Sequence, residues 1–174
     1  QKQVLSSGVI PQIPAIIGNC GGGLALIPTL TDFTFMEEKK AKLFVNAPNA
    51  LDGNVVTKCD TSAASFQSEE AGIVDVVGEE AEVLTKIREL VMLLPANNEE
   101  DVPLEECTDD INRSCEQIEG CTGDTSIALS QLADNGAVFE VKENYAKDMV
   151  TAFIQLNVVT VGALANRSEV YVEE

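Results

Sequence analysis

The sequence predicts an α/β fold in which short strands alternate with helices, and three observations support this. An apolar run at residues 12–17 ends in glycines and leads into a second apolar stretch. That order is expected of a buried strand in a parallel sheet, a turn and a helix. Residues 73–77 are rich in β-branched side chains, as strands are. The clearest helical periodicity in the chain follows at residues 79–94.

Shorter patterns predict the other elements of the first half. Residues 24–30 predict a short helix that Pro28 interrupts, and residues 33–36 predict a second strand. Residues 39–45 fit either a helix or a strand. Residues 46–68 are rich in Asn, Asp, Ser and Thr, which predicts a long surface loop.

The helix at residues 79–94 has recognisable ends. Acidic residues at its N-terminus suit the helix dipole, and Pro95 ends it. Glu82 is placed one turn before Lys86, so the two can pair. The face expected to be buried carries apolar residues at helical spacing: Val83, Leu84, Ile87, Leu90, Val91 and Leu94.

The second half begins with an acidic, solvated linker at residues 96–125. A short helix follows, with Thr125 or Ser126 as its expected N-cap. Three strands come after it, and the last two form a hairpin whose turn lies at Asn157 and Val158. Valine is a poor residue there, because tight hairpin turns require positive φ angles. The strands are predicted at residues 138–141, 149–156 and 159–165.

Composition argues against several classes of function. The chain is 45% hydrophobic, and its net charge of −18 disfavours binding to nucleic acid or to anionic membranes. It has no histidine, so Ser-His-Asp triads and His-metal sites cannot be built from these residues. Five cysteines without a C-x-x-C motif predict neither a disulfide scaffold nor a metal site. With no apolar run of roughly 18 residues and no signal segment, we expect a cytoplasmic protein.

Residues 8–23 carry the most specific motif. They read GVIPQIPAIIGNCGGG, close to the pattern GVIPQIxxIxGPCAGG. This motif resembles that of the acyl-CoA carboxylase carboxyltransferase family. That family includes the propionyl-CoA carboxylase β-subunit and the α-subunits of methylmalonyl-CoA and glutaconyl-CoA decarboxylases. Further matches follow in the same order, at residues 28–36, 93–98, 134–141, 146–150 and 161–166.

The resemblance implies a partial crotonase-like (ClpP/crotonase) spiral. Residues 1–95 correspond to the C-terminal half of the family's N-terminal carboxyltransferase domain, residues 96–125 to a linker, and residues 126–174 to the start of its C-terminal domain. The family's active site lies between these domains from two subunits, which implies a homo-oligomer. The biotin-facing side would lie beyond Glu174, so we expect no activity from this chain alone.

The resemblance also implies a chemistry. Carboxyl transfer between carboxybiotin and an acyl-CoA passes through an enolate at the thioester oxygen, which two backbone N–H groups can stabilise. By position, Gly22 and Gly23 are the expected catalytic donors, with Gly21, Cys20 and Leu24 in the substrate-binding region. Biotin is carried on a partner protein or domain and can supply the base, so the chemistry requires neither histidine nor metal.

Nearby residues have plainer interpretations. Cys20 has no base partner and is expected to be a small buried residue rather than a nucleophile. Asp32 is expected to cap or pair structurally. Lys39, Lys40 and Lys42 are the nearest cations for CoA phosphates, but a solvated surface run is favoured.

The chain departs from the family pattern at four places. Asn19 replaces a proline, and Gly21 replaces an alanine. Residues 46–70 lack the family's EELGGAxxH stretch, which bears on the acyl-group specificity. At the hairpin turn, Asn157 and Val158 stand where Asn-Gly is usual.

Two other classes of function stay open at this point. The chain could be a non-catalytic assembly module of a carboxylase or decarboxylase complex. A hydratase of the crotonase type is disfavoured, because no acidic pair lies near the glycines. The expected partners are a biotin carboxyl carrier protein and either biotin carboxylase or membrane decarboxylase subunits, which would be the route to any membrane association.

Overall fold

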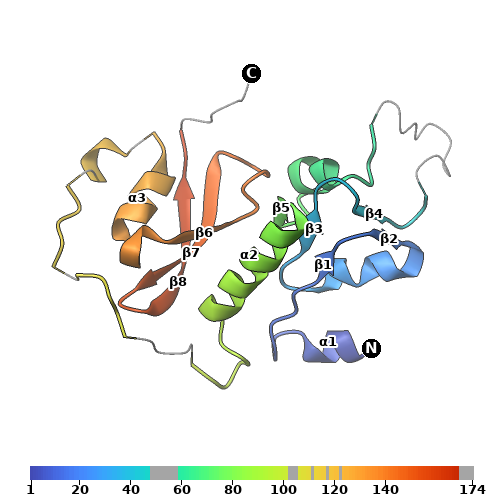
Figure 1. Ribbon diagram of the computed structural model, residues 1–174, viewed down its shortest axis with the longest axis horizontal. Helices are drawn as coiled ribbons and strands as arrows, with labels where there is room; N and C mark the ends of the chain where they lie inside the picture. Colours follow the sequence, from blue (N-terminus) through green and yellow to red (C-terminus); the bar gives the residue numbers. More distant parts are fainter. Residues whose placement is uncertain (48–58, 102–105, 111, 117, 122, 169–174) are drawn as a thin grey trace.

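The computed structural model describes residues 1–47, 59–101, 106–110, 112–116, 118–121 and 123–168. The strands form three small sheets, two of them parallel in the first half and one antiparallel in the second. Figure 1 shows the two halves side by side, with helix α2 between them. The α/β class is therefore as predicted. Within the described ranges, every helix is too short or too polar to cross a bilayer.

One parallel sheet lies at the centre of the first half, in the order β1–β3–β5. Its strands are Ala15–Ile16, Phe35–Glu37 and Val76–Gly78. The strands predicted at residues 33–36 and 73–77 are confirmed with shifted ends. The strand predicted at residues 12–17 is shorter than expected, because Pro14 has no N–H to donate to a neighbouring strand.

A second parallel sheet forms where only a turn was expected. Strand β2, Asn19–Gly21, pairs with strand β4, Lys42–Phe44. Of residues 39–45, which fitted either a helix or a strand, Lys42–Phe44 are therefore strand, whereas Lys39 and Lys40 lie in a turn. The pairing also means that the glycine turn begins only after Gly21, because the first of the three consecutive glycines has extended backbone and belongs to β2.

The helices of the first half are short. Helix α1 spans Lys2–Ser6. The predicted helix at residues 24–30 is instead two 3₁₀ helices, η1 at Gly22–Leu26 and η2 at Pro28–Leu30. They are separate because Pro28 cannot donate the N–H that a continuous helix needs. The predicted loop at residues 46–68 lies partly outside the described residues, at 48–58. Its end is not loop but leads into a π-helix, η3. Helix η3 spans Phe66–Glu70.

Helix α2, Glu80–Leu93, matches its predicted span to within one residue at each end. Val83 and Leu90 are fully buried, as expected. Leu84 and Val91 were also assigned to the buried face, but they are 48% and 53% exposed. Leu84 follows buried Val83, and Val91 follows buried Leu90. Successive residues of a helix point about 100° apart, so Leu84 and Val91 turn away from the core, and the buried face is narrower than the sequence pattern suggested.

The ion pair predicted on this helix is wrong. Lys86 pairs with Glu89 at 2.8 Å rather than with Glu82. The Lys86 ammonium also lies 5.5 Å from the centroid of the Phe139 ring. This cation–π contact draws the lysine toward the second half of the chain.

The second half is an antiparallel sheet covered by one helix. Helix α3 spans Thr125–Leu132, between the short 3₁₀ helices η4, Ile118–Gly120, and η5, Asp134–Gly136. The predicted strands are confirmed, in the order β6–β7–β8. Their bounds are Val138–Val141, Met149–Leu156 and Val159–Asn166.

The N-cap of α3 is Asp124 rather than Thr125 or Ser126. Its carboxylate accepts the Ser126 N–H at 3.0 Å and pairs with Arg167 at 2.9 Å. A carboxylate at this position also suits the helix dipole, which a neutral hydroxyl does not.

Part of the acidic linker is docked rather than simply solvated. Arg113 pairs with Asp109 at 2.9 Å and donates to the carbonyls of Gln131 and Ala133 at 2.5 and 2.7 Å. These carbonyls lie at the C-terminal end of α3, where they receive no N–H group from α3 itself; the Ala133 carbonyl also accepts the Gly136 N–H at 3.0 Å. The linker therefore caps this helix, which a reading of its net charge alone does not suggest.

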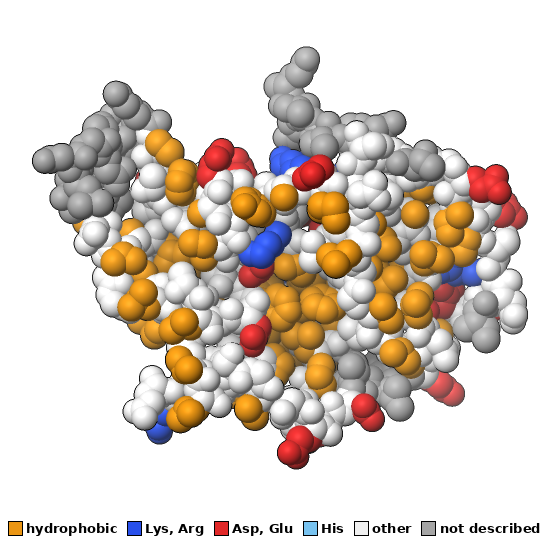
Figure 2. Space-filling view, turned by 180° about the vertical axis from the view of Figure 1, so that it is seen from behind, with side chains coloured by type: hydrophobic (Ala, Val, Ile, Leu, Met, Phe, Trp, Pro, Cys, Tyr) orange, Lys and Arg blue, Asp and Glu red, His pale blue; other side chains and the backbone are white. Residues whose placement is uncertain are grey.

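A shared hydrophobic core joins the two halves. Val83 and Leu90 of α2 pack in one cluster with Phe35 of β3 and with Phe139 and Val141 of β6. Figure 2 shows the molecule from behind the view of Figure 1, and on this face hydrophobic side chains gather where the halves meet. The predicted division into residues 1–95, 96–125 and 126–174 stays a prediction about the family domains; in this structure the first and the last of these segments share a core.

An ion pair between buried Asp75 and partly exposed Lys142 adds to this junction. Lys142 binds the Asp75 carboxylate at 2.9 Å, and its backbone N–H donates to the Asp75 carbonyl at 3.0 Å. The Asp75 side chain is only 7% exposed, and its second oxygen accepts the Thr34 N–H. Asp75 is therefore neutralised and hydrogen-bonded in place, as a buried carboxylate requires.

The β7–β8 hairpin has a strained turn. Asn157 and Val158 both have positive φ, at 51° and 62°, and they form a two-residue connection between paired Leu156 and Val159. The Asp134 carboxylate accepts both turn N–H groups, at 2.9 and 2.7 Å. These bonds hold a conformation that valine disfavours.

We expect Val158→Gly to stabilise the protein, because glycine adopts positive φ without steric cost. Relief of this strain should raise the free energy of unfolding by about 1 kcal/mol, measured by urea denaturation. Val159→Gly is the matched control: it lies next door in an extended strand and should lower stability by about 0.5–1 kcal/mol. Equal losses in both variants would contradict a strained turn.

Candidate active site

The glycine turn connects strand β2 to helix η1. Gly21 is the last residue of β2 and the N-cap of η1, which Gly22 and Gly23 begin. The first N–H groups of a helix have no helical acceptor, so these glycines present donors at its start. Cys20 and Ala25, on either side, are both buried in one core cluster, which fixes the turn at both ends.

The two expected donors have open space beside them. A Cβ atom placed on Gly22 or Gly23 would meet no heavy atom within 4 Å. Gly22 has a φ of +64°, a conformation that favours glycine. A ligand can thus approach the backbone here without meeting a side chain, as close contact with an N–H group requires.

An apolar hollow of about 280 Å³ lies next to the turn. Cys20 and Leu24, which flank the three glycines, contribute to its wall together with Ile16, Ile27 and Pro28. The structure therefore brings together two of the residues expected in the substrate-binding region. An apolar wall beside backbone donors is typical of small-molecule sites, since it strengthens the few polar contacts made there.

Cys20 is a buried residue of this wall. Its exposed fraction is 8%, and burial raises the pKa of its thiol above the usual value. The thiol therefore stays protonated at neutral pH, which disfavours a nucleophilic role. This agrees with the expectation of a small buried residue.

Asp32 and two of the lysines also have structural partners. Asp32 accepts the Gln12 N–H at 2.8 Å. Lys39 binds both Glu38 and Glu79 at 2.8 Å, and these carboxylates raise its pKa above the usual range. Lys42 pairs with Asp60 at 2.7 Å. Asp32 thus has the kind of structural partner that the sequence predicted. Lys39 and Lys42 are held in ion pairs rather than simply solvated.

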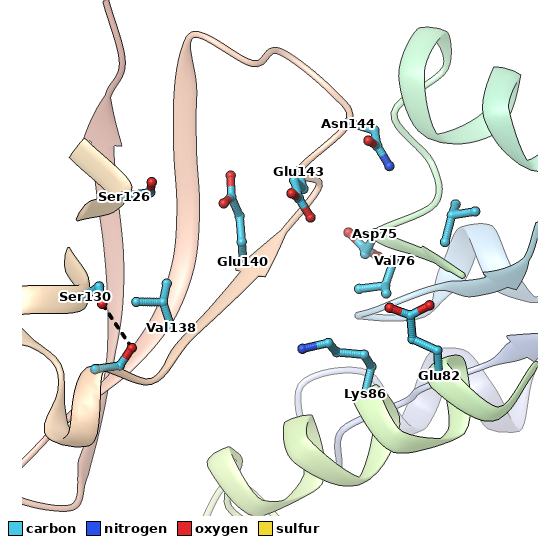
Figure 3. A pocket seen from close by; sticks show the side chains of 12 residues that line it. Asp75, Val76, Glu82, Lys86, Ser126, Ser130, Val138, Glu140, Glu143 and Asn144 are labelled. Atoms are coloured by element: carbon cyan, nitrogen blue, oxygen red, sulfur yellow. Dashed lines mark hydrogen bonds between the residues drawn. The ribbon is translucent and has the colours of Figure 1, made fainter. Parts of the chain in front are cut away.

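A larger cavity of about 380 Å³ lies between the two halves (Figure 3). Glu82 and Lys86 of α2 face it from one side and Glu140 and Glu143 from the other. Burial raises the pKa of Glu140. Acidic side chains prevail in this lining, so the cavity repels an anionic ligand such as a CoA ester. The smaller hollow at the glycine turn has no carboxylate in its described lining.

In the described part of the chain, no three His, Cys, Asp or Glu side chains are grouped so that they could hold a metal ion.

One residue at the glycine turn could not be found from the sequence. Phe44 of β4 lies directly against Gly21. Only the parallel pairing of two three-residue strands brings them together, and such short strands leave little periodic signal.

Comparison with known proteins identifies the family. Residues 1–171 match the family model of the carboxyl transferase domain, and the chain belongs to this family. The propionyl-CoA carboxylase beta chain of Roseobacter denitrificans is 33% identical, over 96% of this chain and 35% of its own length. The methylmalonyl-CoA decarboxylase subunit alpha of Veillonella parvula is 34% identical, over 95% and 35%. The chain thus spans about a third of these relatives.

Solved structures agree with this assignment. Transcarboxylase 12S, crystallised with hydrolysed methylmalonyl-coenzyme A bound, has a TM-score of 0.85 and 32% identity. The match covers 95% of this chain and 34% of that one. A single-chain, multi-domain long-chain acyl-CoA carboxylase has a TM-score of 0.70 at 16% identity, over 95% of this chain and 17% of its own, and shows the shared fold. The expected crotonase-like α/β fold is confirmed.

The raised pKa of Cys20 gives a labelling prediction. Iodoacetamide reacts with thiolates, so at neutral pH we expect exposed Cys59 to be alkylated and buried Cys20 to be protected. Labelling of Cys20 should rise only above its raised pKa or in denaturant. Peptide mass spectrometry gives both rates in one sample, with Cys59 as the internal control. Equal rates under native conditions would show that Cys20 is accessible and ionised.

Proposed function

We propose that the protein containing this chain transfers a carboxyl group between carboxybiotin and an acyl-CoA of the propionyl-CoA or methylmalonyl-CoA type. Membership of the carboxyl transferase family carries this proposal. The names of the relatives indicate the acyl group: propionyl-CoA carboxylase and methylmalonyl-CoA decarboxylase. The apolar hollow beside the glycine turn gives such a short acyl thioester a place to bind.

Within this proposal, Gly22 and Gly23 stabilise the thioester oxyanion. Their N–H groups begin helix η1, where the ends of the backbone dipoles favour negative charge. The open space beside both glycines lets the thioester oxygen reach hydrogen-bonding distance. Cys20 and Leu24 line the adjacent apolar wall, and Gly21 leads the strand into the turn.

The residues at the hollow fit a reaction whose base arrives from elsewhere. Cys20 is the single ionisable side chain among the lining residues described, and burial keeps it protonated. Carboxybiotin, delivered by a carrier protein or domain, supplies the carboxyl group and, once that group has left, the base. The chain's own part is then to orient the thioester, exclude water and hold the negative charge.

The proposal also includes partners. A biotin carboxyl carrier protein and biotin carboxylase or decarboxylase subunits are needed to complete the reaction. A homo-oligomer is supported by transcarboxylase 12S, whose structure is a hexamer assembly. Exposed hydrophobic residues on η1 and η2 are consistent with contacts to another subunit, namely Leu24, Leu26 and Leu30.

The test compares Gly22→Val and Gly23→Val in the full-length protein assembled with its biotin-carrying partner. Each variant places a branched side chain where the thioester must approach, and at Gly22 it also strains a positive φ. We expect acyl-CoA-dependent carboxyl exchange to fall by about 100-fold or more in each, and calorimetric affinity for propionyl-CoA to weaken.

Gly162→Val is the matched control, since a Cβ there also meets open space, but on strand β8. It should keep normal exchange, and thermal melting should show all three variants folded. Exchange that survives both glycine-turn substitutions would refute the oxyanion role. Absence of exchange and of CoA-ester binding in the unaltered assembly would refute the enzyme and favour a non-catalytic assembly module.

A further inference from the structure

Gly21 and Phe44 make an unusually close contact. They are partners in the parallel register of β2 and β4. A Cβ atom built on Gly21 would lie 2.6 Å from Phe44 Cε2 and 2.7 Å from its Cζ. Carbon atoms in contact normally stay near 3.5–4.0 Å apart. The end of the phenylalanine ring therefore occupies the space that a side chain at Gly21 would take.

Space, and not backbone conformation, is the reason for glycine at this position. Gly21 has φ −123° and ψ 160°, an extended conformation open to any residue. Gly22 is the opposite case, with φ +64° and no neighbour near its missing Cβ. Two adjacent glycines thus serve different needs: Gly22 permits the turn, and Gly21 accommodates the Phe44 ring.

The position of Phe44 is set by its strand. Leu43 is buried in the core cluster that contains Cys20, so alternation along β4 directs the half-buried Phe44 to the other face. There its ring lies against the backbone of Gly21. Gly21 is the N-cap of η1, and its peptide link leads directly to the N–H of Gly22.

We propose that Phe44 is a positioning residue, whose ring holds the Gly21 backbone and thereby sets the direction of the Gly22 and Gly23 N–H groups. The inference rests on the proposed oxyanion function and deepens it. The ring occupies the place that a Cβ atom on Gly21 would take, so it is the packing partner of this stretch of backbone.

A double-mutant cycle tests this in the assembled full-length protein. Phe44→Ala removes the ring, and Gly21→Ala forces it aside. In each we expect kcat for carboxyl exchange to fall about tenfold while the KM for propionyl-CoA changes less than about twofold. In Gly21→Ala/Phe44→Ala the new methyl group fills the vacated space, so kcat should return to within about threefold of the parent.

Tyr145→Ala is the matched control. The Tyr145 ring lies 3.0 Å from the position of a Cβ on Gly72, so it also covers a glycine, but away from the glycine turn. This variant should lower the melting temperature about as much as Phe44→Ala does and leave kcat unchanged.

The outcomes separate the two proposals. If the parent assembly catalyses exchange but Phe44→Ala loses only thermal stability, as Tyr145→Ala does, the positioning role is refuted and the proposed function stands. Single-variant losses that multiply in the double variant also refute it, because the two side chains are then uncoupled. A parent without exchange refutes both. Recovery in the double variant supports the ring as the element that sets the turn.

Discussion

Helix α2 is the element on which both halves of the structure depend. Its buried residues Val83 and Leu90 contact Phe35 from the parallel sheet and Phe139 from the antiparallel sheet in a single cluster. Among the described residues, neither sheet has more than three strands, and such small sheets need a packed face to be stable. The helix supplies that face to both, and the Lys142–Asp75 pair fastens the junction at one point.

The glycine turn packs on a second core cluster, separate from the one around α2. The cluster beneath it holds Cys20 and Ala25 from either side of the glycines, together with Leu43 of β4. Strand β2 delivers the chain to the turn, and β4 fixes the register at which it arrives. A site made of backbone N–H groups can be positioned only through the backbone, so these two short strands matter more to it than any charged side chain does.

Charge plays a smaller part at the turn than the net value of −18 suggests. Lys39 and Lys42 are held in ion pairs, and acidic side chains gather instead in the cavity between the halves. The hollow at the glycines has an apolar wall, where a hydrogen bond to a developing negative charge is stronger than it would be in water.

Much of the fold could be predicted from the sequence, and the failures share a physical cause. In helix α2 and strands β6–β8 the spacing of apolar residues repeats along the element, so the sequence pattern is clear. Strands β2 and β4 have three residues each, and tertiary pairing decides them rather than local preference. The Asp124 cap lay one residue outside the expected positions.

The candidate site also has one part that the sequence predicted and one part that it did not. The motif at residues 8–23 located the glycine turn, because a motif records the family's chemistry directly. The contact between Phe44 and Gly21 could not be predicted, since it joins residues far apart in the chain through a register that no local pattern reports. The narrower buried face of α2 was missed for a related reason, as burial depends on which neighbours pack against each side.

In the proposed site, the thioester oxygen binds the N–H groups of Gly22 and Gly23. A crystal structure of the full-length protein with propionyl-CoA bound tests this directly. We expect the thioester oxygen at about 3 Å from both nitrogens, with the acyl chain against Leu24 and Cys20. A thioester bound in the acidic cavity between the halves, or one whose oxygen contacts neither glycine, would contradict it.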